Sequence, residues 1–164
     1  MNQFTASHRG LITGGLMIAL ALFFFYELKQ PVDSPYQYYI YTVYTLGIIW
    51  NLLAFNKKAD GTTRFKDYFS AGFKTFIIIT FLMAVFSFIF FFFHPEIRDN
   101  KIELNNQLVI QQGNYTPAEI AENAKRLKDI YMPMTIAITT FMYLFLGALI
   151  TAIISGVMMQ IKKI

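Results

Sequence analysis

Long apolar stretches alternate with polar segments along this chain. Four of the stretches are long enough to cross a bilayer, since a helix needs about 20 apolar residues to span a hydrocarbon core of about 30 Å. None of them alternates apolar and polar residues as a strand of a membrane barrel does. Lipid offers the backbone no hydrogen bonds, so each stretch is predicted to be a helix. The predicted membrane helices are roughly residues 10–28, 36–55, 71–93 and 134–159.

The segment between the last two membrane helices, residues 94–132, is long and polar. Within it, Thr116–Pro117–Ala118–Glu119 has the pattern of an N-cap, a first-turn proline and a capping-box glutamate. Apolar residues follow at helical spacing, which predicts a short amphipathic helix over Pro117–Tyr131. A kink or break is predicted at Pro133, before the last membrane helix. For residues 99–115 our hypothesis is a short strand or hairpin.

The pattern as a whole predicts one all-α domain over residues 1–164. Its architecture would be an integral membrane four-helix bundle, with a short amphipathic helix in the outer loop between the third and fourth membrane helices. The composition agrees, because 55% of the residues are hydrophobic and only 15% are charged, which a soluble domain of this size does not show. The chain has no cysteine. That absence excludes disulfides, thiol catalysis and thiolate metal sites.

Basic side chains gather on one side of the predicted membrane helices. The net charge is +4, and Arg9 precedes the first helix on the same side as the basic turn after the second, whereas residues 94–132 carry both signs. Lysine and arginine mark the cytoplasmic side, so both termini are predicted to be cytoplasmic and residues 94–132 to face outward. No nucleic-acid-binding signature accompanies the charge. The basic cytoplasmic face, a candidate surface for anionic lipid or an acidic partner, comprises Lys57, Lys58, Arg64 and Lys66.

Small and hydroxyl-bearing side chains recur along the predicted membrane helices. Such residues let helix backbones approach closely in lipid, where apolar attraction alone does not drive association. We interpret them as a face for packing inside the bundle, or alternatively for self-association or a partner protein. The residues of this helix-packing or partner face are Gly10, Gly14, Gly72, Gly147, Thr151 and Ser155.

The second predicted helix carries the most polar stripe, made by Gln37, Tyr41, Tyr44 and Asn51. Their spacings of four, three and seven residues place them near one face of a helix. If they face the interior, they would line a small polar cavity or bind a lipid or another ligand. The alternative is that they form hydrogen bonds between helices and an interfacial aromatic belt.

A polar cluster is predicted at the outer interface, where His94–Pro95–Glu96 follows the third membrane helix and Glu27 ends the first. One outward histidine without cysteine does not favour a metal site, and neither a metal nor a cofactor is predicted. His94 is interpreted as a residue that ends a helix. No nucleophile elbow, phosphate-binding loop or dinucleotide fingerprint is present, so no catalytic residues are assigned.

Several features taken together resemble a known family. They are a first helix with Gly10, Gly14 and Gly15, the basic turn leading into Phe65–Lys66–Asp67–Tyr68, the His94–Pro95–Glu96 exit and the acidic amphipathic segment that follows. This combination resembles a domain-of-unknown-function family of small bacterial membrane proteins with four helices. The resemblance implies a Gram-negative inner-membrane protein without an established activity. Such proteins are often encoded beside a glycosyltransferase that uses polyprenyl-phosphate sugars. The resemblance therefore also implies a role as the membrane anchor of such an enzyme.

The function expected from the sequence is that of a non-catalytic accessory or anchor subunit in the bacterial inner membrane. It would bind membrane lipids and another membrane or membrane-associated protein, or a second copy of itself, through its helices or its basic cytoplasmic face. One alternative is a protein that handles lipids or small solutes with the polar stripe of the second helix. Another is a membrane enzyme that acts at the outer face through Glu27, His94 and Glu96.

Overall fold

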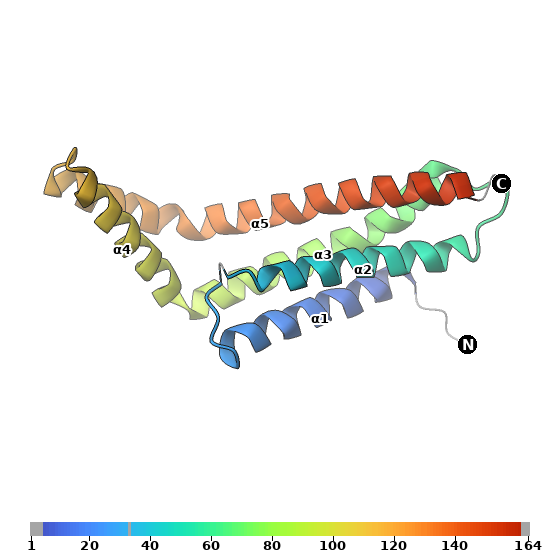
Figure 1. Cartoon of the computed structure of the whole chain (residues 1–164), viewed down its shortest axis with the longest axis horizontal. Helices are drawn as coiled ribbons and strands as arrows, with labels where there is room; N and C mark the ends of the chain where they lie inside the picture. The colour runs from blue at the N-terminus through green and yellow to red at the C-terminus, as the bar shows by residue number, and fades with distance from the viewer. Residues whose placement is uncertain (1–4, 33, 162–164) are drawn as a thin grey trace. The chain divides into compact units, whose positions relative to one another are not determined.

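The computed structural model describes residues 5–32 and 34–161, and its described regular structure is entirely helical (Figure 1). The described helices are α1 (Ala6–Tyr26), α2 (Gln37–Asn56), α3 (Phe65–Phe93), α4 (Pro95–Gln112) and α5 (Pro117–Ile161). Of these, α1, α2, α3 and α5 are long and apolar enough to cross a membrane. The predicted all-α fold with four helices of membrane-spanning length is therefore confirmed.

α3 begins at Phe65, several residues before the predicted start near residue 71. The carboxylate of Asp67 accepts a hydrogen bond of 2.9 Å from the backbone N–H of Arg64. This is the part that the acidic residue plays in a capping box, and it satisfies one of the donors that the first turn of a helix leaves open. The helix therefore includes the basic segment that precedes the apolar stretch.

The hypothesis of a strand or hairpin over residues 99–115 is wrong, because most of this segment belongs to α4. Pro95 occupies the first turn of α4, where its missing N–H would have had no partner. Glu96 places a negative charge beside the same helix end, which the helix dipole favours. Gly113 ends the helix with a φ of 70°, a left-handed conformation that glycine adopts without a side-chain clash.

The capping box predicted at the start of α5 is confirmed. The backbone N–H of Thr116 donates to the Glu119 carboxylate at 2.7 Å, and the N–H of Glu119 donates to the Thr116 hydroxyl at 3.3 Å. Of the kink or break predicted at Pro133, the break is wrong, since α5 continues through this residue to Ile161. A proline removes a single backbone donor, and long helices in membranes tolerate such a loss.

α5 is too long to lie wholly within a bilayer. Its 45 residues extend over about 67 Å at 1.5 Å per residue, roughly twice the thickness of a hydrocarbon core. The first part of α5 carries most of the charged residues of the helix. If α5 crosses a membrane, that part would lie outside the hydrocarbon, in the same polar region of the chain as α4.

The described chain forms two compact units. One comprises the described residues up to Met83 and from Thr140 onward, and the other is Ala84–Thr139. The core of the first unit is built from side chains of α1, α2, the first part of α3 and the last part of α5, and its fully buried large residues include Met17, Tyr44, Tyr68 and Ile79. Many other large apolar side chains of these helices are exposed, which agrees with helices that are apolar enough to cross a membrane.

Candidate functional site

The residues predicted as a helix-packing or partner face are all buried within the first unit: Gly10, Gly14, Gly72, Gly147, Thr151 and Ser155. Gly10 lies against the backbone of α3, because a Cβ added there would stand 3.0 Å from the carbonyl oxygen of Thr75. A Cβ on Gly14 would stand 2.7 Å from Cδ1 of Leu82, which also lies on α3. Both glycines therefore bring α1 close to α3 inside this chain.

Two further glycines make room for large or branched side chains of other helices. A Cβ on Gly72 would stand 2.9 Å from the hydroxyl oxygen of Thr151. A Cβ on Gly147 would overlap the hydroxyl of Tyr44 and stand 2.6 Å from Cγ of Phe76. The glycines of this helix-packing face are thus in contact with other helices of the same chain.

The polar stripe of α2 makes hydrogen bonds between helices. Tyr44 is fully buried, and its hydroxyl donates to the carbonyl of Tyr143 on α5 at 2.7 Å. The ring of Tyr41 also packs against Tyr143, with 5.7 Å between the ring centroids. Tyr41 and Gln37 are half-buried. These contacts match the second interpretation of the stripe, in which its polar groups join helices.

Asn51, the last residue of the stripe, joins three helices through one side-chain amide. Its nitrogen donates to the carbonyl of Ala71 on α3 at 2.9 Å, and its oxygen accepts from the guanidinium of Arg9 on α1 at 3.1 Å. Only 1% of Asn51 is exposed. We call Arg9, Asn51 and Ala71 the polar node. Sequence reasoning read Arg9 only as an orientation signal and missed its buried acceptor.

The hydroxyl of Thr75 provides a second link at the same end of α1. It donates to the carbonyl of Ala6 at 3.2 Å, from a side chain that is fully buried in α3. A polar group buried in a helix bundle needs such a partner, because leaving it unpaired costs free energy. This end of the first unit is therefore held by polar contacts as well as by close packing.

The side chains of the predicted basic cytoplasmic face are exposed around the turn between α2 and α3: Lys57, Lys58, Arg64 and Lys66. The carboxylate of Asp60 organises this turn by accepting hydrogen bonds from the backbone N–H and the hydroxyl of Thr62, at 3.0 and 2.7 Å. These hydrogen bonds, led by the one from the Thr62 hydroxyl, hold the pKa of Asp60 below its ordinary value. The cations thus project from a turn that has its own internal structure.

Of the predicted outer-interface cluster, the structure brings together His94 and Glu96. The Nδ1 atom of His94 lies 2.7 Å from the Glu96 carboxylate, and the hydrogen bond between them is the main reason that the pKa of Glu96 is lowered. Glu27 belongs to the other unit, where it caps the C-terminal end of α1. Within residues 5–32 and 34–161, no group of three or more histidine and acidic side chains is placed to hold a metal ion.

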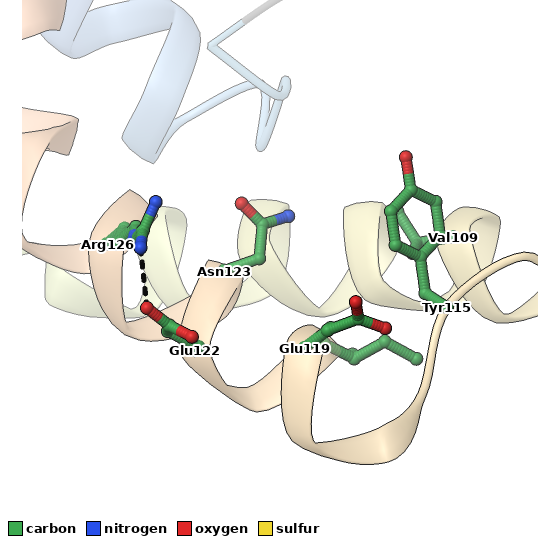
Figure 2. Close-up of a pocket in the computed structure, with 7 residues that line it drawn as sticks. Val109, Tyr115, Glu119, Glu122, Asn123 and Arg126 are labelled. Carbon is green, nitrogen blue, oxygen red and sulfur yellow. Dashed lines mark hydrogen bonds and ion pairs between the residues drawn. The ribbon is translucent and has the colours of Figure 1, made fainter.

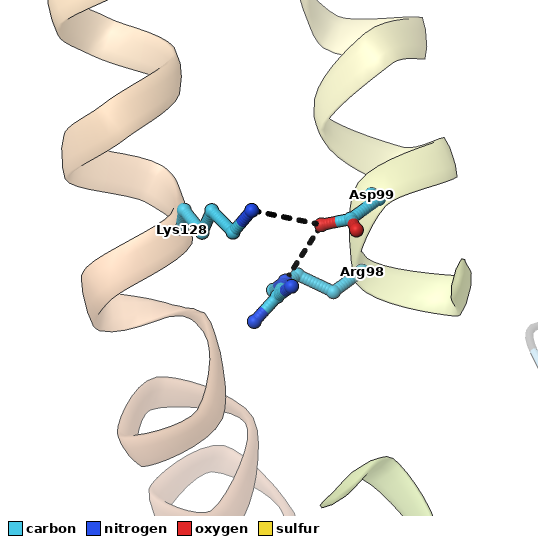
Figure 3. Close-up of polar contacts among 3 residues, drawn as sticks. All are labelled: Arg98, Asp99 and Lys128. Atoms are coloured by element: carbon cyan, nitrogen blue, oxygen red, sulfur yellow. Dashed lines mark hydrogen bonds and ion pairs between the residues drawn. The ribbon is translucent and has the colours of Figure 1, made fainter. Parts of the chain in front are cut away.

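The second unit contains a pair of polar helical segments, α4 and the first part of α5, which we call the polar hairpin (residues 95–131). An ion cluster links its two segments (Figure 3). The Asp99 carboxylate on α4 lies 2.8 Å from Nε of Arg98 and 3.9 Å from Nζ of Lys128 on α5. The hydrogen bond from Arg98, aided by both positive charges, lowers the pKa of Asp99. Asp99 and Lys128 are exposed, so the ion pair between the two segments contributes little to stability.

A shallow pocket of about 300 Å³ lies near the end of the hairpin (Figure 2). Glu119, with its capping hydrogen bonds, lines one part of it, and the Glu122–Arg126 ion pair of 2.5 Å lines another. The two hydrogen bonds from Thr116 hold the pKa of Glu119 below its ordinary value. Small-molecule sites are mostly apolar and enclosed. The lining of this pocket is charged and open to solvent, so the pocket is a weak candidate for a small-molecule site.

The polar hairpin exposes large apolar side chains outside the four apolar stretches. Leu104 and Leu108 on α4 are 62% and 54% exposed, and they lie four residues apart, hence on one face of the helix. Ile110 is 60% exposed. Sequence reasoning missed this face because it did not expect a helix here. The signals were Pro95 and Gly113, which are the start and stop residues of α4.

Comparison with known proteins found one family. A family model described as "Protein of unknown function (DUF4199)" matches residues 9–160, which is nearly the whole chain. No curated protein and no solved structure matches the chain.

Proposed function

The chain belongs to the DUF4199 family of proteins of unknown function, and we propose that it is a non-catalytic accessory subunit of a membrane complex. In this proposal the polar hairpin binds a partner protein. The observation that carries the proposal is the exposure of Leu104 and Leu108 on one face of α4. Exposed apolar side chains that share a face are typical of interaction surfaces.

The charge of the polar hairpin favours a protein as the partner over the membrane surface. Residues 95–131 carry five cationic and six anionic side chains, so they offer no net attraction to anionic lipid. Helices that lie on a membrane usually have a broad apolar face and a strongly basic polar face. On α4 the two leucines instead stand among charged and amide side chains, which resembles the apolar centre and polar rim of a protein interface.

The alternative of a protein that handles lipid or small solutes has less support. Tyr44 and Asn51 would have to offer their polar groups to a ligand, but both are buried and bonded to backbone carbonyls of this chain. The alternative of an outer-face enzyme rests on the pair His94 and Glu96 alone. We therefore retain the accessory role as the leading proposal.

We also propose that the chain lies in the bacterial inner membrane with both termini in the cytoplasm. The basic turn with Lys57 and Lys58 would then be cytoplasmic and the polar hairpin would face outward, as the distribution of cations favours. A glycosyltransferase of the kind that the resemblance implies is one partner to test. If such an enzyme binds from the cytoplasm, it would meet the basic turn instead of the hairpin.

The double variant Leu104→Glu, Leu108→Glu is expected to weaken partner binding by about 100-fold, since it removes two apolar anchors and would bury two charges. Co-purification from membranes in mild detergent, with the bound partner identified and quantified, measures this loss. The control is Ala118→Glu with Ala121→Glu, which adds the same two charges at exposed positions of α5 and is expected to retain the partner.

Two results would contradict docking at the hairpin. One is an unchanged amount of partner in the leucine variant. The other is loss of the partner only when Lys57 and Lys58 are replaced by glutamine, which would move the docking surface to the basic turn. If the wild-type chain carries no stoichiometric partner in membranes from its own source, the accessory role itself fails.

A further inference from the structure

Lys66, Ser70 and Lys74 form a row along the first part of α3. All three side chains are exposed, and their spacing of four residues places them one above another on the same side of the helix. The two lysines are eight residues apart, a rise of about 12 Å. Their flexible four-carbon stems can therefore bring both ammonium groups over Ser70.

A ladder of phenylalanines stands beside this row. The rings of Phe65 and Phe69 stack with centroids 5.9 Å apart, and those of Phe69 and Phe73 stack with centroids 6.4 Å apart. Phe65 and Phe73 are 39% and 44% exposed, so the ladder presents an aromatic wall to the surroundings. Phenylalanine is among the apolar side chains with which interfacial helices enter the boundary between headgroups and acyl chains.

The length of α3 places this row at the depth of the headgroups. Its 29 residues extend over about 44 Å, which exceeds the hydrocarbon core by about 14 Å, or about nine residues. The last residues of α3 are almost all apolar, and the cations lie in its first ten. The excess length is therefore at the N-terminal end, where Lys66 and Lys74 are found.

The nearest acidic residues along the chain are already bonded to the backbone. Asp60 accepts from the N–H of Thr62 at 3.0 Å, and Asp67 accepts from the N–H of Arg64 at 2.9 Å. In the part of the chain that the structure describes, neither lysine of the row forms an ion pair with a carboxylate. An external anion can supply the missing charge.

We propose that Lys66, Ser70 and Lys74 bind the phosphate group of an anionic phospholipid in the leaflet around the N-terminal end of α3. The ammonium groups contact the phosphate, the Ser70 hydroxyl donates to it, and the phenylalanine ladder packs against the upper acyl chains. The ladder selects a lipid over a soluble acidic protein, because a soluble partner offers no acyl chains to cover it. This site is independent of the partner proposed for the polar hairpin.

The test is the retention of phosphatidylglycerol by the purified chain, measured by native mass spectrometry after reconstitution in vesicles of phosphatidylcholine mixed with phosphatidylglycerol. The wild type is expected to retain phosphatidylglycerol in preference to phosphatidylcholine. The variant Lys66→Gln, Lys74→Gln should lose about 30-fold in relative affinity, which corresponds to the contribution of two lysines near a charged surface. The variant Lys66→Arg, Lys74→Arg keeps the charge and should retain the lipid.

The control is Lys57→Gln with Lys58→Gln, which removes the same charge from the same end of the molecule but away from the phenylalanine ladder. It is expected to retain phosphatidylglycerol. An equal loss in the control would show diffuse attraction to the basic turn and overturn the site. Unchanged retention in the Lys66 and Lys74 variant would overturn it as well.

Discussion

Replacement of Gly147 by alanine is expected to lower the free energy of unfolding by about 1–3 kcal/mol, the usual cost of overpacking a well-filled core. The added Cβ would overlap the hydroxyl of Tyr44 and approach Cγ of Phe76 to 2.6 Å. Tyr44 is fully buried, and Phe76 is only 2% exposed, so both rings are enclosed by other parts of the chain. Movement of Tyr44 would also break its 2.7 Å hydrogen bond to the carbonyl of Tyr143.

Thermal unfolding of the detergent-purified chain measures this effect. Gly156 provides the control, because it lies in the same helix and a Cβ added there would meet nothing within 4 Å. Alanine is favoured over glycine in a helix interior by about 1 kcal/mol, so Gly156→Ala should leave the midpoint unchanged or raise it. If Gly147→Ala is as stable as Gly156→Ala, then α5 does not pack against α2 and α3 as described.

Replacement of Asn51 by leucine is expected to lower the free energy of unfolding by about 2–4 kcal/mol, because it leaves the part-buried Arg9 guanidinium without its acceptor. The Arg9 guanidinium would lose the oxygen that it reaches at 3.1 Å, and α2 would lose its amide contact of 2.9 Å to the Ala71 carbonyl. The same guanidinium lies 5.7 Å from the centroid of the Trp50 ring. That cation–π contact cannot replace a directed acceptor.

A double-mutant cycle separates the polar node from a general loss of packing. Asn51→Leu, Arg9→Met and the double variant are compared by unfolding in detergent, and the double variant should cost less than the sum of the two single changes. Thr42→Val is the control, since the exposed Thr42 hydroxyl donates to the carbonyl of Tyr38 within its own helix. If Asn51→Leu is as stable as Thr42→Val, the polar node does not stabilise the packing of α1, α2 and α3.

The fold was predictable where the chemistry is local. Apolar stretches predicted the four long helices, and the spacing from Thr116 to Glu119 predicted the capping box that starts α5. Two local predictions were wrong. Pro133 did not break α5, because one missing donor does not outweigh the turns on either side. The hypothesis of a strand or hairpin over residues 99–115 was wrong, because Pro95 and Gly113, which define the ends of α4, were not recognised as start and stop signals of a helix.

The sequence identified residues for candidate sites, but it did not identify the side chains that those residues contact. Thr151 occupies the space beside Gly72, and Tyr44 occupies the space beside Gly147, which is about a hundred residues away in the sequence. No spacing rule connects positions so distant, because tertiary packing alone decides which helices meet. The link between Arg9 and Asn51 was missed for the same reason, although an asparagine inside an apolar stretch is itself a sign of a buried polar contact.

One-sided labelling of single cysteines tests whether α3 crosses the membrane, and the cysteine-free chain is well suited to it. Gln111 on α4 and Lys57 at the end of α2 are exposed, and α3 lies between them in the sequence. A membrane-impermeant maleimide applied to intact cells should label Gln111→Cys, and it should label Lys57→Cys only after permeabilisation. Labelling of both cysteines from the same side would show that α3 does not cross the membrane, and would contradict the account.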